Sequence, residues 1–278
     1  MPTAAENAHY IRVTKGIIAK KYRNAYGLGP IDYVTRWGVI SYWKLNEASG
    51  TRSDTIGTNH LTDNNSVGQA AGKVSATSAQ FIATSNEYLS RVDNASLSTG
   101  DVDFWIACWV YLDSLGSSRV WAEKGSNGAF EWYLEKNASQ QPTFFIFNPA
   151  GASLATVLNS TVLTTGQWYF VIAYHDSVNN EVGISLDGST FTTSIANTPP
   201  TDGIGGFEFG RDGSSPSQNH DGRLNAVVFG KSPPGGIGAK KTEIRDILYN
   251  SGNGIEYPWS DQEAVKMALQ GKIKTINK

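Results

Sequence analysis

The sequence predicts an all-β protein with an extended arm at its N-terminal end and a short helix at its C-terminal end. The chain has 278 residues, of which 11% are aromatic and only 17% charged, and 29 are glycine. This composition favours strands and turns, and the length suffices for a substantial core. From Val39 onward, short apolar runs alternate with clusters of turn residues, as in successive strands of a sheet.

Hydrophobic periodicity defines the individual elements. The run at 103–112 is almost continuously apolar, which is typical of a strand buried on both sides. A helix is expected over 242–252, where apolar residues share one face and Gly252 is a stop signal. A second helix is expected from Ser260, which has capping-box spacing with Glu263. The expected strands are, in chain order, 39–45, 103–112, 130–134, 143–147, 167–176 and 181–188.

Cysteine content and hydropathy exclude several classes of protein. The single cysteine, Cys108, excludes an internal disulfide framework and a zinc site built from cysteines. No run of apolar residues reaches the length of about 18 that a membrane helix needs. The N-terminal residues lack the charged and apolar regions of a secretory signal, so we expect none.

Charge is unevenly distributed and suggests three parts. Residues 1–37 carry six basic and two acidic residues, residues 38–254 carry 13 basic and 20 acidic, and residues 255–278 carry four basic and three acidic. We therefore expect an N-terminal docking arm at 1–37, a β domain at 38–254 and a helical tail at 255–278. A solvated tail is the alternative for the arm, and its scattered charges are a weak signal for nucleic-acid binding. The predicted docking residues are Arg12, Lys15, Lys20, Lys21 and Arg23.

Several segments together resemble the laminin-G-like, concanavalin-A-like lectin/glucanase superfamily. They occur in the order and at the spacing of the superfamily, and the resemblance implies a two-sheet antiparallel jelly roll over residues 39–254. Members of this fold often bind glycans, and some hold a structural calcium ion. The matching segments are 40–51, 104–111, 166–171, 182–188, 221–227 and 242–254.

The resemblance does not extend to catalysis. Glucanases of this superfamily carry two carboxylates on one strand in an E-x-D-x-x-E pattern, which places a nucleophile and an acid/base in one cleft. The sequence has no such pattern, and the nearest candidates are Glu123, Glu131 and Glu135. We interpret these as solvent-facing strand carboxylates. No catalytic residue is assigned, and we expect that the protein is not an enzyme.

Candidate sugar contacts come from two places in the chain. Sugar sites combine an aromatic plate with polar side chains, because the apolar face of a sugar stacks while its hydroxyls form hydrogen bonds. Trp121 and Trp132 are the candidate plates, with core packing as the alternative. Asp212 and His220 belong to a polar loop that is either a binding-site rim or an ordinary connector. Three other tryptophans, Trp43, Trp109 and Trp168, lie within apolar runs and are expected in the core.

Glu47 and Asp54 occupy positions where relatives supply calcium ligands, so the resemblance implies a metal site there. Calcium requires several oxygen ligands that converge. The closing strand departs from the superfamily's frequent I-D-E-V, because Asn225 and Ala226 stand where relatives have carboxylates. This departure weakens the prediction of a calcium site.

A laminin-G-like domain of this kind is similar to domains in structural proteins of tailed bacteriophages. The resulting hypothesis is a non-catalytic virion protein, such as a capsid decoration, head-fibre or tail-associated component, that is assembled in the host cytoplasm. Residues 1–37 and 255–278 would bind other virion proteins, and the domain would contact host-surface glycans as a homo-oligomer or lattice-bound copy. The alternative is a stand-alone bacterial carbohydrate-binding lectin.

Overall fold

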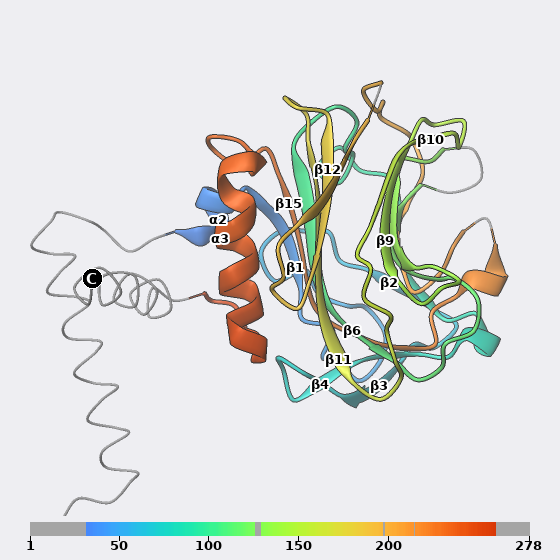
Figure 1. Ribbon diagram of the computed structural model, residues 1–278. Coiled ribbons are helices and arrows are strands. Elements are labelled where there is room, and N and C mark those ends of the chain that lie inside the picture. The colour runs from blue at the N-terminus through green and yellow to red at the C-terminus, as the bar shows by residue number, and fades with distance from the viewer. Residues whose placement is uncertain (1–31, 126–128, 197, 214, 260–278) are drawn as a thin grey trace, which may run out of the picture. The chain divides into compact units, whose positions relative to one another are not determined.

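The computed structural model describes residues 32–125, 129–196, 198–213 and 215–259 (Figure 1). The chain divides into two compact units, one formed by Val34–Glu256 and the other by Met1–Tyr33 with Tyr257–Lys278. All strands of the described residues belong to the first unit, and the all-β prediction is confirmed. The five predicted docking residues and the helix expected from Ser260 lie outside the described residues.

Two antiparallel sheets face each other in the unit (Figure 1). The eight-stranded sheet contains, in spatial order, β13 (Thr192–Ile195), β12 (Glu181–Leu186), β11 (Trp168–Asp176), β6 (Phe104–Leu112), β15 (Gly222–Lys231), β4 (Thr77–Phe81) and β3 (Gly68–Ala71), and β1 (Val39–Trp43) also pairs with β15. The seven-stranded sheet contains β10 (Ser153–Leu158), β9 (Pro142–Phe147), β8 (Trp132–Lys136), β7 (Arg119–Lys124), β14 (Phe207–Phe209), β5 (Tyr88–Arg91) and β2 (Thr62–Asn64).

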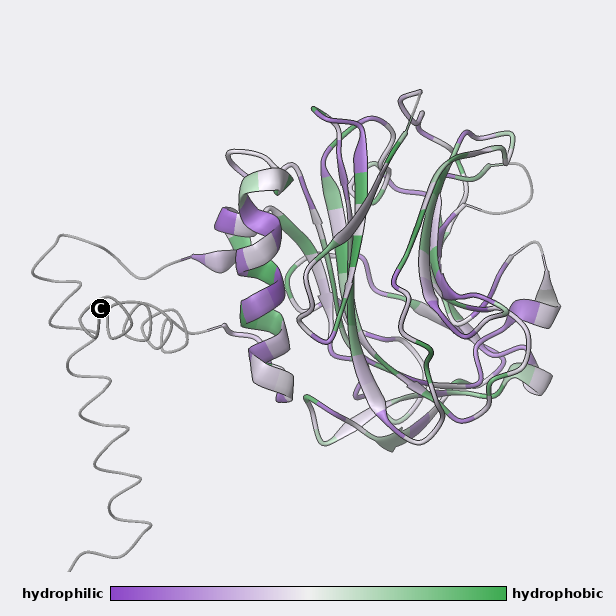
Figure 2. Cartoon of the chain, viewed as in Figure 1, coloured by the Kyte–Doolittle hydropathy of each residue, from purple (hydrophilic) through white to green (hydrophobic). Residues whose placement is uncertain are grey.

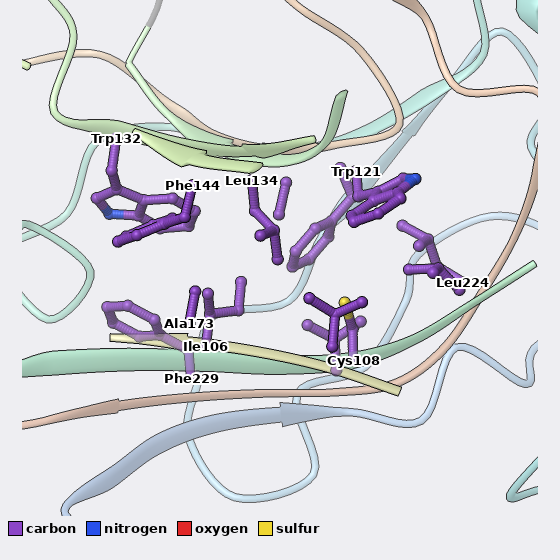
Figure 3. Packing of buried hydrophobic residues seen from close by; sticks show 14 of the residues in the cluster. Ile106, Cys108, Trp121, Trp132, Leu134, Phe144, Ala173, Leu224 and Phe229 are labelled. Atoms are coloured by element: carbon purple, nitrogen blue, oxygen red, sulfur yellow. The ribbon is translucent and has the colours of Figure 1, made fainter. Parts of the chain in front are cut away.

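The hydrophobic core fills the space between the sheets. Trp121, Trp132 and Phe144 project from the seven-stranded sheet toward residues such as Ile106 and Phe229 of the other sheet (Figure 3). Cys108 is part of this core and is 1% exposed, and burial raises the pKa of its thiol to about 12. The thiol therefore acts as a small apolar side chain. Every strand expected from the sequence is found, with bounds shifted by a few residues.

Helix α3 (Ile237–Tyr249) covers the outer face of the eight-stranded sheet. Its apolar residues Ile244, Ile247 and Leu248 are buried, and polar residues alternate with them along the helix (Figure 2). The helix begins five residues before the expected start, because the carboxylate of Asp103 accepts a hydrogen bond of 2.8 Å from the backbone N–H of Ile237. This long-range cap satisfies one of the amides at the helix start.

The segment that precedes β1 is tied to α3 and to the eight-stranded sheet. In α2 (Tyr33–Trp37), Arg36 donates two hydrogen bonds of 2.6 and 2.7 Å to Glu243. The backbone carbonyl of Trp37 accepts a bond of 2.9 Å from the indole N–H of Trp105. Arg36 and Trp37 were expected in the docking arm, and in the structure they contact the sandwich.

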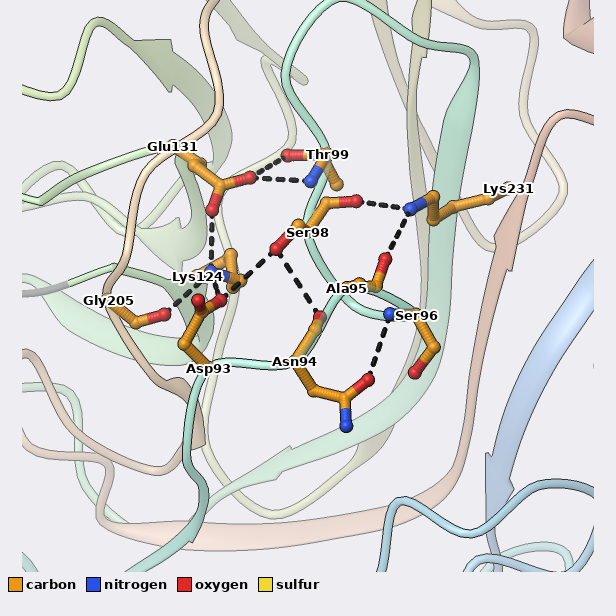
Figure 4. Close-up of polar contacts among 10 residues, drawn as sticks. All are labelled: Asp93, Asn94, Ala95, Ser96, Ser98, Thr99, Lys124, Glu131, Gly205 and Lys231. Carbon is orange, nitrogen blue, oxygen red and sulfur yellow. Dashed lines mark hydrogen bonds and ion pairs between the residues drawn. The ribbon is translucent and has the colours of Figure 1, made fainter.

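A buried ionic network stabilises the connection between β5 and β6 (Figure 4). The Lys124 ammonium, which is fully buried, lies 2.6 Å from Glu131 and 2.9 Å from Asp93, and it donates to the carbonyl of Gly205. Glu131 in turn accepts bonds from the backbone N–H and the hydroxyl of Thr99. Glu131 is therefore a structural group, 2% exposed, and its interpretation as a solvent-facing carboxylate is wrong.

The described residues of the loop between β14 and β15, 211–213 and 215–219, fold back on the outer face of the seven-stranded sheet. The loop is closed at its base by a hydrogen bond of 2.8 Å from the His220 N–H to the Gly210 carbonyl. Gly210 has a φ of 87°, and a Cβ atom there would lie 2.4 Å from the Phe81 ring. Only glycine suits this position, so Gly210 determines where the loop leaves β14. The 3-10 turns are η1 (Ala83–Ser85), η2 (Pro216–Gln218) in this loop, and η3 (Asn250–Gly252) after α3.

Candidate functional site

A row of outward-facing side chains crosses the seven-stranded sheet, with carboxylates at one end and aromatic rings at the other. Residues opposite each other in antiparallel strands share a face, so the strand register defines the row. Its members, from β5 to β10, are Ser90, Glu208, Glu123, Tyr133, Phe145 and Thr156. We call these six residues the front row.

Two carboxyl groups on this face of the sheet, Glu123 of the front row and Glu135 of β8, are buried, and the pKa of each is raised. Glu123 is fully buried, and burial, with the neighbouring Glu208 and Asp212, raises the pKa of its carboxyl well above the usual range. One Glu123 oxygen accepts a bond of 2.9 Å from the backbone N–H of Gly213, and the other has no hydrogen-bond partner among the described residues. Burial and Asp212 raise the pKa of Glu135, which faces outward two residues beyond Tyr133, to about 7. Such shifts mark functional sites more often than ordinary surface.

The loop at 211–219 holds the acidic end of the front row closed. Arg211 donates two hydrogen bonds of 2.6 and 3.0 Å to Glu208, and its guanidinium lies 3.7 Å from the centroid of the Tyr88 ring. Both oxygens of Glu208 are therefore engaged in a bidentate pair. These contacts hold the acidic end in place next to the aromatic end.

The aromatic end of the front row is half-exposed. The ring centroids of Tyr133 and Phe145 lie 4.7 Å apart, and Phe147 and Phe130 extend the cluster, with centroid distances of 4.8 Å from Tyr133 to Phe147 and 5.7 Å from Phe147 to Phe130. Tyr133, Phe145 and Phe130 remain partly open to solvent. Together they form an aromatic surface that no helix of the described residues covers (Figure 1).

A groove of about 370 Å³ adjoins this aromatic surface and shares Thr156 with the front row. It lies between β10 and β13, the edge strands of the two sheets. Five of its seven lining residues carry hydroxyls, and the set is Thr156, Val157, Leu158, Ser160, Thr192, Thr193 and Ser194. Aromatic rings beside a groove that has both apolar and hydroxyl-bearing residues form an amphipathic surface.

Comparison with protein families decides the family of the chain. A family model described as the concanavalin A-like lectin/glucanases superfamily matches residues 72–231, which is more than half of the chain. The chain belongs to the concanavalin A-like lectin/glucanase superfamily. The resemblance inferred from the sequence is thereby confirmed at the level of the superfamily. No curated protein matches the chain.

Solved structures of this superfamily fold share little sequence with the chain. The binding domain of Paraclostridial Mosquitocidal Protein 1 has a TM-score of 0.63 and 13% identity, over 77% of this chain and 52% of that one. Domain 4 of AbnA, an arabinanase of Geobacillus stearothermophilus, has a TM-score of 0.51 and 14% identity, over 74% and 98%. The botulinum neurotoxin serotype D binding domain has a TM-score of 0.55 and 10% identity, over 76% and 52%. The chain thus spans about half the length of these toxin binding domains, and the likeness shows the fold alone.

The two tryptophans predicted as sugar plates are core residues in this superfamily member. Trp121 is fully buried and Trp132 is 1% exposed. The Trp132 ring packs against Phe104 and Phe207, with centroid distances of 5.8 and 5.3 Å (Figure 3). The prediction of ligand stacking is wrong for both, because their side chains point inward. A register shift between Val120 and Ala122 interrupts the alternation on which the assignment of Trp121 depended.

The two predicted rim residues have different places. Asp212 lies on the folded-back loop and, with 8% exposure, acts electrostatically on Glu123 and Glu135. His220 is fully buried against Phe81, at a centroid distance of 5.8 Å, and burial lowers the pKa of its imidazole to about 4. His220 is therefore a neutral anchor of the loop, and its prediction as a sugar contact is wrong.

The predicted calcium ligands serve the local backbone. Asp54 accepts hydrogen bonds of 2.9 to 3.1 Å from the backbone amides of Tyr42, Ile56, Gly57 and Asn59. Glu47 accepts one of 2.8 Å from the amide of Ser53. No group of three or more His, Cys, Asp or Glu within the described residues is arranged to hold a metal ion. These residues therefore do not fit the calcium site that the superfamily implies.

Asn225 explains why the closing strand lacks a carboxylate. Its amide oxygen accepts bonds from the backbone amides of Lys73, Val74 and Ser75, and its NH₂ group donates to the carbonyls of Lys44 and Thr77. An amide can both donate and accept here, which a carboxylate cannot. The side chain therefore stabilises a turn directly.

Sequence reasoning missed the residues that form the aromatic end of the front row. Tyr133 and Phe145 each neighbour a core aromatic residue in the chain, Trp132 and Phe144, and of these four residues only Trp132 was chosen as a candidate. Strict alternation in Trp132–Lys136 would have placed Tyr133 and Glu135 together on the outer face. Glu123 and Glu135 do face outward, but at 0% and 4% exposure they are not solvent-facing.

Proposed function

We propose that the chain is a non-catalytic carbohydrate-binding module whose glycan lies along the aromatic end of the front row and enters the adjoining groove. The observation that supports this most strongly is the continuity from Tyr133 and Phe145 to Thr156 and the groove hydroxyls. The apolar faces of pyranose rings stack on aromatic side chains, while hydroxyl-lined walls exchange hydrogen bonds with sugar hydroxyls. One surface of this superfamily member thus offers both kinds of contact.

The carboxylates favour binding over hydrolysis. Hydrolysis with two carboxylates needs one ionised group and one protonated group that both reach the glycosidic bond. Here both oxygens of Glu208 are engaged by Arg211, and Glu123 is buried under the loop with its pKa raised by burial. Neither of these two carboxyl groups is therefore open to a sugar. The front row contains no basic residue that could bind the carboxylate of a sialic acid or a uronic acid, so the ligand is a neutral glycan.

Structures with a related fold support carbohydrate binding in a general way. Domain 4 of AbnA was solved in complex with arabinotriose, and other similar structures are binding domains of toxins. These statements concern those proteins. They support the proposal because a sandwich of this fold presents large uncovered faces, and the front row lies on one of them.

The wider role that we propose rests on the resemblance to bacteriophage structural domains and is supported by the charge distribution. The module is a virion structural component, displayed on a capsid or tail, and the basic residues near the N-terminal end bind an acidic lattice protein. Six basic against two acidic residues in 1–37, beside 20 acidic residues in 38–254, support this arrangement. A bacterial lectin that acts alone remains the alternative, and it requires glycan binding without assembly.

The decisive experiment for glycan binding is a glycan array with the full chain and two variants. The wild type is expected to retain neutral oligosaccharides, and Tyr133→Ala to retain them more weakly, because the stacking ring of the front row is removed. Tyr133→Phe is the matched control, since it keeps the ring and is expected to bind as the wild type does. Equal binding by Tyr133→Ala, or a preference for sialylated glycans, would contradict the proposal.

The virion role has a separate test. Replacing Arg12, Lys15, Lys20, Lys21 and Arg23 by Glu in the full chain is expected to abolish incorporation into particles without changing glycan binding. A variant that still assembles would remove the docking role of these residues. Replacement is preferable to truncation at residue 37, because Trp37 is a fully buried partner of Trp105.

A further inference from the structure

A second row of side chains crosses the outer face of the eight-stranded sheet, on the side away from the front row. Trp168 of β11 lies opposite Tyr111 of β6, Tyr111 opposite Arg223 of β15, and Arg223 opposite Gln80 of β4. The register therefore places all four side chains on one face. We call these four residues, with Asp113 that bonds to two of them, the back row.

Helix α3 covers the outer face only as far as the cross-strand pair of β6 and β11 that lies next to the back row. Its last residue, Tyr249, covers Trp109 and Phe170, with ring-centroid distances of 6.0 and 5.8 Å. The next pair along the same two strands, Tyr111 and Trp168, is half-exposed. The six other tryptophans in residues 34–256 are at most 3% exposed. The expectation that Trp168 belongs to the core is therefore wrong, whereas the same expectation is confirmed for Trp43 and Trp109.

The polar members of the back row are held in a fixed arrangement. Arg223 donates a bond of 3.1 Å to the Gln80 carbonyl oxygen, and the Gln80 NH₂ group donates one of 2.7 Å to Asp113. Arg223 also lies 3.5 Å from the Asp113 carboxylate and 4.2 Å from the Tyr111 ring centroid. The Arg223 and Asp113 side chains remain 22% and 34% exposed. A ligand would meet groups that are already ordered, which lowers the entropic cost of binding.

We infer that the back row is a second carbohydrate site, for a neutral oligosaccharide. Trp168 provides a ring for stacking, and the planar groups of Arg223, Gln80 and Asp113 provide adjacent donors and acceptors for neighbouring sugar hydroxyls. The opposite charges of Arg223 and Asp113 balance, so the row offers no net charge to an ionic ligand. The row crosses three strand spacings, about 14 Å, which suits several sugar residues in line.

The inference takes its ligand class from the proposed function and places a separate site on the opposite sheet. Front and back rows face away from each other, so one module can bind two glycan chains or two positions of one surface. Occupation of both sites would raise the apparent affinity for a polymeric glycan well above the affinity for a short one.

Tryptophan fluorescence of the full chain tests the back row selectively. Trp168 is the half-exposed tryptophan, so the difference in acrylamide quenching between the wild type and Trp168→Phe reports on its ring. We expect neutral polysaccharides, of which soluble arabinan, β-glucan and galactan are the probes, to protect Trp168 from quenching. Trp168→Ala and Arg223→Met are expected to weaken retention of the protecting polysaccharide in affinity gels about tenfold, in proteins that unfold at the wild-type temperature.

The same measurements separate this inference from the proposed function. In Tyr133→Ala, protection of Trp168 is expected to persist, because the two rows lie on different sheets. Unchanged quenching with all three neutral polysaccharides, or protection by heparin alone, would overturn the back-row site. Protection of Trp168 together with wild-type array binding by Tyr133→Ala would contradict the front-row proposal and leave the back row supported.

Discussion

Trp132 and Tyr133 are adjacent in β8 and point to opposite sides of the seven-stranded sheet, so their replacement by alanine should have opposite consequences. Trp132 is 1% exposed, and its ring contacts Phe104, Phe207 and Phe229. Truncation to alanine removes these contacts and leaves a cavity, which costs about 3–5 kcal/mol of the free energy of unfolding. For a domain of this size, such a loss lowers the melting temperature by about 6–20 °C.

Tyr133 is half-buried on the outer face, and its loss leaves a recess that water can fill. Tyr133→Ala is therefore expected to cost about 1 kcal/mol of stability while removing the contribution of the front row to glycan retention. The assay is urea denaturation followed by circular dichroism, combined with retention on immobilised glycan at a temperature where every variant is folded. Trp132→Phe is the control that keeps a ring in the core. If Trp132→Ala unfolded like the wild type and lost glycan binding, the inward orientation of Trp132 would be refuted.

Four further predictions concern ionisable groups. Glu131→Gln leaves the buried Lys124 ammonium without its nearest counter-charge, so the free energy of unfolding should fall by about 3–5 kcal/mol in urea titrations, and an unchanged midpoint would contradict the network. Burial raises the pKa of Glu135 to about 7, so between the ordinary pKa range of glutamate and about pH 7 the folded protein binds more protons than the unfolded chain. The contribution of Glu135 to the free energy of unfolding therefore falls as pH rises through this window. The lowered pKa of His220, about 4, has the opposite effect, with stability lost as pH falls from about 6.5 toward 4. Thermal melts of Glu135→Gln and His220→Asn should each lack the corresponding slope. Asp54→Asn should destabilise the protein, because it weakens four hydrogen bonds from backbone amides. EDTA should leave the melting temperature of the wild type unchanged. A shift of the melting temperature with EDTA would restore the calcium hypothesis.

Local patterns predicted the long central strands well, because these strands are buried on both sides. Their residues are apolar whichever face of the sheet each side chain points to. The runs at 103–112 and 167–176 correspond to β6 and β11. Short edge strands such as β13 (Thr192–Ile195) have mainly exposed small polar residues and resemble loops in the sequence. They form because a neighbouring strand supplies hydrogen bonds, which a local pattern does not reveal.

The candidate site was harder to predict than the fold for two reasons. It depends on which side chains of a strand face outward, and on a loop that brings residues distant in the chain onto the sheet. Strict alternation in β7 would place Trp121 and Glu123 on the same face of the sheet. A single register shift places Trp121 in the core and Glu123 on the outer face. The pKa of Glu135 depends on Asp212, which is distant in the chain and arrives through the loop at 211–219. Trp168 shows the same limitation, since an apolar run indicates a strand but not where a covering helix ends.

The central claim is that a neutral glycan lies on the aromatic end of the front row. A crystal structure of the full chain with the oligosaccharide retained on the array tests it most directly. The claim predicts a pyranose ring stacked on Tyr133 or Phe145, with hydroxyls within hydrogen-bond distance of Thr156 or other residues of the groove. A glycan that leaves the front row empty, or one held by a metal ion near Glu47 and Asp54, would contradict it.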